Sequence, residues 1–306
     1  MKHLISINDL TTKEIEELFE LGWSFKEILT RDLKKVPSLR GKSVVNLFFE
    51  NSTRTRTSFE YAGKRLSADV INISASSSSV SKGETIMDTV KTIEAMVPDV
   101  IVVRHSSSGV PAYIAKQMQC SAIVNAGDGT HEHPTQALLD MLTIQEAVKE
   151  KNVAGLTALI IGDITHSRVA RSNILLMNKM GMNVRVCGPK TMIPRDIDKL
   201  GCTVYNDLEE ALRGTDIIMP LRIQQERISD ACFPTLREYS IFYGMNLKRY
   251  KLANKKAFVM HPGPMNRGVE IMPDLADSDH SKVLNQVHNG VAIRMAVLFK
   301  LATASK

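Results

Sequence analysis

Residues 52–56 read Ser-Thr-Arg-Thr-Arg and place five hydrogen-bond donors directly after the apolar run at residues 44–49. A helix that begins in this segment adds unpaired backbone N–H groups and about half a positive charge at its start. Hydroxyl and guanidinium groups in that setting suit a phosphate group. The alternative is an ordinary polar helix start with solvated arginines, but the flanking apolar strand favours a phosphate site.

A second reactive group is the triplet His131, Glu132 and His133. Two imidazoles and a carboxylate are frequent zinc ligands, yet no further ligand follows at a suggestive spacing. Pro134 predicts that a helix begins immediately after the triplet. We therefore interpret His133 as a neutral hydrogen-bond donor to a substrate carbonyl, with a metal site and a functionless loop histidine as the alternatives.

Further cationic or turn-forming residues also follow apolar strand candidates. They are Arg104, Arg168, Arg222 and the dipeptide Pro262-Gly263. In parallel α/β sheets, ligands bind beyond the carboxyl ends of the strands, where these residues are expected to gather. So many cationic groups at one edge predict a ligand set with at least two anionic groups.

The elements that position these residues alternate along the chain. Strands are predicted at residues 43–49, 70–74, 99–104, 122–125, 157–161, 183–187, 203–205, 216–220, 241–243 and 257–261. Helices are predicted at residues 11–30, 56–66, 85–96, 111–118, 134–150 and 287–301. The serine-rich stretch at 74–81 is interpreted as a mobile loop.

Strands that alternate with helices predict an α/β protein of two doubly wound domains. Each domain is expected to be a mainly parallel sheet flanked by helices, with the active site in the cleft between the domains. The expected domains are residues 1–148 and 149–286, and the C-terminal helix, residues 287–306, is expected to pack back onto the first domain.

Composition narrows the function classes. The chain has 306 residues and a net charge of +6, but its basic clusters are only pairs such as Lys34-Lys35, which argues against nucleic-acid binding. No apolar run is long enough for a membrane span or a signal peptide, so a soluble cytoplasmic protein is expected. The four cysteines are scattered and are interpreted as reduced thiols.

Gly162-Asp163 lacks the further glycines of a dinucleotide site, so a nicotinamide dehydrogenase is the weaker hypothesis.

Four segments together resemble the carbamoyltransferase family. They are residues 49–59, Phe-Glu-Asn-Ser-Thr-Arg-Thr-Arg-Thr-Ser-Phe; 82–85, Lys-Gly-Glu-Thr; 133–136, His-Pro-Thr-Gln; and 261–264, His-Pro-Gly-Pro. Their order and spacing match along essentially the whole chain. Residues 82–85 and 221–224, Leu-Arg-Ile-Gln, are similar to the aspartate branch. Gly263 departs from the leucine of some relatives, with little expected consequence because the family uses a backbone carbonyl there.

The resemblance implies roles for individual residues. Carbamoyl phosphate would be bound by Ser52, Thr53, Arg54, Thr55, Arg104, His133, Gln136, Pro262, Gly263 and Ser78. L-Aspartate would be bound by Lys82, Arg168, Arg222 and Gln224. The residues implied in catalysis are His133, Arg54, Arg104, Thr55 and Lys82. Ser78 and Lys82 would come from the neighbouring subunit of a homotrimer, and no metal or cofactor is expected.

Two other functions stay open at this point. One is a carbamoyltransferase for another amine such as ornithine, although Arg222 would suit its side-chain cation poorly. The other is a noncatalytic sensor of an anionic metabolite. Regulatory chains or another pyrimidine enzyme stay open as further partners.

Overall fold

The computed structural model describes residues 1–74, 85–223 and 235–304. The chain divides into two compact units, one of residues 1–139 and 288–306, the other of residues 140–287. The first sheet has four parallel strands in the order β2-β1-β3-β4, and the second has five in the order β7-β6-β5-β8-β9. The prediction of two parallel sheets flanked by helices is therefore confirmed.

The first sheet contains β1 (Ser43–Phe48), β2 (Asp69–Ser74), β3 (Val100–His105) and β4 (Ala122–Asp128). Its helices are α1 (Thr12–Leu29), α2 (Thr53–Arg65), α3 (Ile86–Glu94) and α4 (Val110–Gln117). Helix α5 (Pro134–Val148) begins in this unit, and α11 (Val283–Ala302) ends in it.

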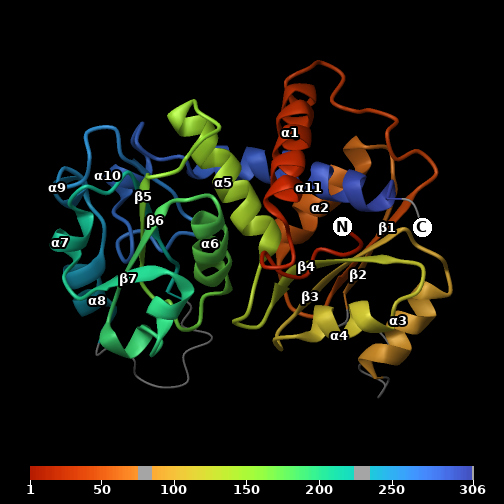
Figure 1. The fold of residues 1–306 in the computed structure, drawn as a ribbon, viewed down its shortest axis with the longest axis horizontal. Helices are drawn as coiled ribbons and strands as arrows, with labels where there is room; N and C mark the ends of the chain where they lie inside the picture. Colours follow the sequence, from red (N-terminus) through yellow and green to blue (C-terminus); the bar gives the residue numbers. More distant parts are fainter. Residues whose placement is uncertain (75–84, 224–234, 305–306) are drawn as a thin grey trace. The chain divides into compact units, whose positions relative to one another are not determined.

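Helices cover both faces of the first sheet (Figure 1). Val90 of α3 and Ile114 of α4 pack against Leu47 and Val103 on one face. On α2, a Cβ added to Gly63 would come within 2.6 Å of Val70 on β2, so glycine permits close packing of this helix. The central strands β1 and β3 are almost wholly buried, which explains their continuous apolar sequences.

The second sheet contains β5 (Thr157–Ile161), β6 (Asn183–Cys187), β7 (Cys202–Tyr205), β8 (Ile217–Pro220) and β9 (Phe258–Val259). Its helices are α6 (Arg168–Lys179), α7 (Leu208–Leu212), α8 (Leu236–Tyr243), α9 (Leu247–Tyr250) and α10 (Pro273–Ala276). Leu212, Tyr250 and Leu275 bring three of these helices into one core with Leu159 and Ile218 of the sheet.

One predicted strand is wrong, because residues 241–243 form the end of α8. Thr235 caps this helix by accepting a hydrogen bond from the backbone N–H of Glu238. Tyr239 is buried, whereas Ile241 and Phe242 are each 58% exposed. The β-branched and aromatic residues suggested a strand, but the cap and one buried face give a helix.

The described cysteines are free thiols. Cys120 is exposed, whereas Cys187 and Cys202 are buried. Burial raises the pKa of Cys187 to about 12 and that of Cys202 to about 11. These two thiols behave as core residues, as expected for structural cysteines. No helix in the described ranges is long and apolar enough to cross a membrane.

Candidate active site

Three neighbouring strands of the first sheet end at the same edge. The order β1-β3-β4 and the parallel direction place the segments that leave these strands side by side. Phe48 pairs with Arg104 in the register, and the next residue, Phe49, donates its backbone N–H to the carbonyl of Arg104 at 2.9 Å. The Ser52 segment, Arg104 and the segment leading to His133 therefore lie at one sheet edge.

The start of α2 differs from the starts of α1 and α3. Those helices begin with capping boxes formed by Thr11 and Thr85 with acidic partners. Ser52 is the N-cap of α2, but its hydroxyl makes no capping hydrogen bond, and the first turn of this fully described helix contains no acidic residue. The positive end of the α2 dipole is thus not offset by a carboxylate in the first turn of the helix.

The residues of the predicted phosphate segment are all at least partly accessible to solvent. Thr53 and Arg54 are exposed, and Ser52 and Thr55 are half-buried. The side chains are therefore accessible from solvent at the end of an otherwise buried strand. Such an arrangement of hydroxyl, guanidinium and backbone donors can bind an anion.

Arg104 is fixed from two sides. One guanidinium nitrogen lies 2.7 Å from the carboxylate of Glu50, and the other donates to the carbonyl of Ala126 at 3.1 Å. The side chain therefore links the segment after β1 to β4. Glu50 was not singled out from the sequence, although its place just before Ser52 is a signal that an acid borders the predicted anion site.

His133 lies immediately before α5 and is only 4% exposed. Its carbonyl accepts the backbone N–H of Gln136 at 2.9 Å, so both residues belong to the first turn of the helix. Gln136 is also buried, at 9% exposure. The short spacing thus brings an imidazole and an amide to the same helix start.

The triplet around His133 does not have the geometry of a zinc site. The carboxylate of Glu132 accepts hydrogen bonds from the hydroxyl of Ser6 and from the backbone N–H of Ile7, the latter at 3.0 Å. It therefore fastens the N-terminal segment. In the described part of the chain, no three His, Cys, Asp or Glu side chains gather as a metal-binding group.

The second unit presents its own cationic residues after adjacent strands. Arg168 is the first residue of α6, directly after the N-cap Ser167, whose hydroxyl accepts the N–H of Ala170 at 3.1 Å. Arg222 follows Leu221, whose N–H donates to the carbonyl of Ile161 at 2.8 Å. The strand order β5-β8 therefore places both arginines at the carboxyl edge of the second sheet.

The turn after β9 lies at the same edge of the second sheet. The backbone N–H of His261 donates to Gln286 at 2.8 Å, and the N–H of Gly263 donates to the imidazole of His261 at 2.9 Å. Pro262 lies between them, and Gly263 adopts a φ of 67°, which suits glycine. The side chain of His261 is in turn paired with Glu270 at 3.2 Å.

Gly162 has a packing role. Its φ is 123°, and a Cβ added there would lie 2.8 Å from the hydroxyl of Tyr239. The backbone needs glycine because an aromatic side chain crosses this strand end. This explains Gly162 without a dinucleotide site.

Three predicted site residues, Ser78, Lys82 and Gln224, lie outside the described residues. The other predicted residues form two sets, one in each unit, and each set lies at the carboxyl edge of its own sheet. The set of the first unit contains Ser52, Thr53, Arg54, Thr55, Arg104, His133 and Gln136. The set of the second contains Arg168, Arg222, Pro262 and Gly263.

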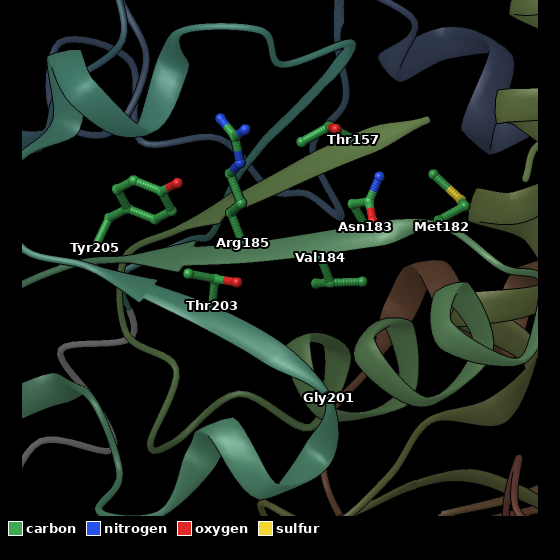
Figure 2. Close-up of a pocket in the computed structure, with 8 residues that line it drawn as sticks. All are labelled: Thr157, Met182, Asn183, Val184, Arg185, Gly201, Thr203 and Tyr205. Atoms are coloured by element: carbon green, nitrogen blue, oxygen red, sulfur yellow. The ribbon is translucent and has the colours of Figure 1, made fainter. Parts of the chain in front are cut away.

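A cavity of about 300 Å³ lies elsewhere in the second unit (Figure 2). Thr157 and Asn183, the first residues of β5 and β6, help to line it. Arg185 places its guanidinium 5.3 Å from the ring centre of Tyr205 and donates to the carbonyl of Ala211 at 2.9 Å. The guanidinium of Arg185 is thus already occupied by contacts within the protein. The cavity also lies at the amino ends of the strands, opposite the carboxyl edge at which parallel sheets bind ligands.

Comparison with known proteins identifies two consecutive family domains. Residues 2–146 match the carbamoyl-P binding domain of aspartate/ornithine carbamoyltransferase, and residues 154–301 match the Asp/Orn binding domain of the same family. Together the two matches cover nearly the entire chain.

Individual relatives are also similar over their full length. The chain is 56% identical to the aspartate carbamoyltransferase catalytic subunit of Syntrophotalea carbinolica, covering 100% of this chain and 96% of the relative. It is 58% identical to that of Syntrophus aciditrophicus, with 99% and 98% covered. The aspartate transcarbamoylase of Trypanosoma cruzi, solved in complex with N-(phosphonacetyl)-L-aspartic acid, superposes with a TM-score of 0.86 at 30% identity, with 97% and 95% covered.

Proposed function

Since this chain belongs to the aspartate/ornithine carbamoyltransferase family, we propose that it transfers the carbamoyl group of carbamoyl phosphate to the amine of L-aspartate. The products are N-carbamoyl-L-aspartate and phosphate. The observation that carries the proposal is the grouping of the α2 start, Arg104 and the His133 segment at one edge of the first sheet. The high identity to aspartate carbamoyltransferase catalytic subunits favours aspartate as the acceptor.

The phosphate group of carbamoyl phosphate is assigned to the start of α2. Ser52 makes no capping bond within the helix, so its hydroxyl can donate to a phosphate oxygen. Thr53, Arg54 and Thr55 supply further donors on the same helical turn. The dipole of α2 adds a favourable charge interaction with the anion.

The carbamoyl group is assigned to residues of both sets. Arg104 binds between the phosphate and the carbonyl oxygen, and His133 donates a hydrogen bond to that oxygen. Gln136 and the backbone carbonyls of Pro262 and Gly263 accept hydrogen bonds from the carbamoyl amide. A carbonyl polarised in this way is a better electrophile, because the donors stabilise the charge that develops on its oxygen.

The aspartate substrate is assigned to the second set together with two residues outside the described ranges. Arg168 and Arg222 bind the two carboxylates, for which planar guanidinium groups are well suited. Gln224 and Lys82 complete this part of the site.

The reaction begins when the neutral amine of aspartate attacks the carbamoyl carbon and forms a C–N bond. The electron pair of the carbonyl moves to its oxygen, which His133 and Arg104 stabilise as an oxyanion. Collapse of this intermediate breaks the bond to the phosphate oxygen, and the leaving phosphate accepts the proton from the amine. Catalysis then rests mainly on positioning two anions and on electrostatic stabilisation, so the chemistry requires no metal or cofactor.

The assembly and the cellular role belong to the same proposal. The active unit is a homotrimer in which Ser78 and Lys82 enter the site of the neighbouring subunit. The enzyme acts in the cytoplasm in de novo pyrimidine biosynthesis. Family resemblance supports these statements, and the roles of the individual residues stay predictions.

The test is to supply purified protein with carbamoyl phosphate and either L-aspartate or L-ornithine, and to identify the products by mass. Carbamoyl aspartate should form, together with an equal amount of phosphate. Formation of citrulline would support the ornithine branch. Binding of carbamoyl phosphate without turnover of either amine would support a noncatalytic sensor.

A further inference from the structure

The carboxylate of Asp128 collects four hydrogen bonds in the first unit. One oxygen accepts from the side-chain amide of Asn125 at 2.9 Å and from the backbone N–H of Glu132 at 3.1 Å. The other accepts from the backbone N–H of Gly109 at 2.7 Å and lies 3.1 Å from the Nδ1 atom of His131. Asp128 is only 1% exposed. Its carboxylate therefore has little room for a ligand and acts within the protein.

These bonds close the turn that leads to His133. The backbone N–H of Asp128 donates to the carbonyl of Glu132 at 3.2 Å, and its carbonyl accepts the N–H of His131 at 2.9 Å. Backbone and side chain of one residue thus hold both ends of the five-residue turn. The residue after this turn is His133, so the turn sets the position of the His133 backbone.

The same carboxylate joins the turn to a neighbouring helix. Gly109 is the N-cap of α4, where a negative charge is stabilised by the helix dipole. Gly129, within the turn, packs so closely that an added Cβ would come within 2.7 Å of the backbone nitrogen of Ser108. The turn is consequently seated against the start of α4, and Asp128 is the charged group at the centre of the contact.

Asp128 also stays ionised despite its environment. Burial raises its pKa, but the hydrogen bonds from His131, Gly109, Asn125 and Glu132 outweigh burial, so the net pKa is lowered from 3.8. A carboxylate that accepts several hydrogen bonds is stabilised in its charged form. Asp128 is therefore a charged hydrogen-bond acceptor at neutral pH.

We propose that Asp128 is a positioning residue for carbamoyl transfer, which fixes the 128–132 turn and thereby holds His133 in its reactive place. This inference rests on the proposed function, because it assumes that His133 stabilises the oxyanion. Asp128 is 1% exposed and acts through the turn that precedes His133. A small displacement of an oxyanion donor is enough to slow a reaction strongly.

The first variant is Asp128→Asn, which keeps the size of the side chain. Its amide oxygen can still accept from Asn125 and Glu132, but its NH₂ group faces the donor of Gly109. We expect kcat to fall about tenfold, on the scale of a misplaced catalytic group, while KM for aspartate changes less than about twofold. A loss confined to KM, or an unchanged kcat, would overturn the proposal.

A double-mutant cycle separates positioning of His133 from general destabilisation. In a His133→Ala background, Asp128→Asn should change kcat less than about twofold, because there is no imidazole left to position. If Asp128→Asn lowered kcat by the same factor in both backgrounds, Asp128 would act on the reaction by a route other than His133. An inactive wild type would instead refute the proposed function, and a fully active His133→Ala protein would refute the role of His133.

The matched control is Asp99→Asn at the opposite edge of the same sheet. Asp99 accepts from the backbone N–H of Ser43 at 2.9 Å and from Lys42 at 3.1 Å, so it also fastens backbone. This variant should lower the free energy of unfolding without affecting kcat. If kcat fell equally in the control, loss of any structural carboxylate would slow the enzyme. That result would contradict a specific role for Asp128.

A milder variant, His131→Ala, covers the case in which Asp128→Asn does not fold. The side chain of His131 is 40% exposed, and its removal deletes one of the four partners of Asp128. We expect a fall in kcat of about two- to fivefold in the wild-type background and none in the His133→Ala background. A folded His131→Ala protein with wild-type kcat would contradict the inference.

Discussion

The carboxylate of Glu50 lies 2.7 Å from the guanidinium of Arg104, and the two side chains are only 17% and 11% exposed. A negative charge thus stands within the proposed anion site and competes for Arg104. Glu50→Gln should tighten the binding of inorganic phosphate by up to about tenfold, or about 1.4 kcal/mol, because one repulsive charge is removed. Calorimetric titration with phosphate measures this change.

The control for this titration is Glu60→Gln. Glu60 is another carboxylate of the α2 region, but it pairs with Lys64 and Asn72 on the sheet side. Phosphate affinity should be unchanged in this variant. Weaker phosphate binding in Glu50→Gln would mean that Glu50 mainly holds Arg104 in its binding position.

Arg222→Ala should mainly raise the KM for aspartate. Arg222 follows β8 in the second unit, whereas the residues assigned to phosphate lie in the first. We expect KM for aspartate to rise about 100-fold, since a charged hydrogen-bonding partner of a carboxylate is worth about 3 kcal/mol. Calorimetry should show little change in the affinity for carbamoyl phosphate. A large loss of that affinity would contradict the assignment of phosphate to the first unit and aspartate to the second.

Acid should weaken the capping box of α1. The hydrogen bond from the backbone N–H of Thr11, followed by the N-terminal ammonium of Met1, lowers the pKa of Glu14 from 4.5 to about 2. Since the folded-state pKa is the lower one, this stabilisation is present above about pH 4.5 and is lost as the pH falls toward 2. Glu14→Gln should therefore lower the free energy of unfolding by about 0.5–1 kcal/mol at pH 7, after allowance for solvent screening.

Denaturant unfolding at a series of pH values measures this difference between wild type and Glu14→Gln. The difference should shrink as the pH falls below about 4.5. Glu16→Gln on the same helix is the control, because Glu16 is exposed. A difference for Glu14→Gln that is constant down to pH 3 would rule out the lowered pKa as its source.

Subunit mixing tests the proposed shared site. If each site combines His133 of one chain with Lys82 of the next, Lys82→Ala and His133→Ala proteins should each be nearly inactive. After dissociation and joint reassociation, three-quarters of the trimers are mixed, and each mixed trimer has one intact site of three. Recovered activity should reach about a quarter of wild type by this counting for a closed ring. Activity no greater than the sum of the separate variants would exclude a shared site.

Much of the fold could be predicted because buried parallel strands have continuous apolar sequences. Val44 and Val100 lie in such runs, and the residues after them reach the expected sheet edge. The strand predicted at residues 241–243 was wrong because a capped helix with one buried face overrides local β propensity.

The acidic residues of the site were harder to find from sequence. Glu50 and Asp128 gain their roles only when the register of β1, β3 and β4 brings Arg104, Ala126 and Gly109 beside them. Cationic residues after strands could be recognised because their chemistry suits anions directly. The predictions for Ser78, Lys82 and Gln224 fall on residues that the structure does not describe.

The most direct measurement follows carbamoyl phosphate labelled with ¹³C in the presence of aspartate, using wild type and His133→Ala protein in parallel. His133 is buried at the start of α5, where an oxyanion donor is proposed. The label should appear on the aspartate nitrogen with wild type, and turnover should be roughly 100-fold lower with a folded His133→Ala protein. Failure of the wild type to form labelled carbamoyl aspartate, or equal turnover by the two proteins, would contradict the account.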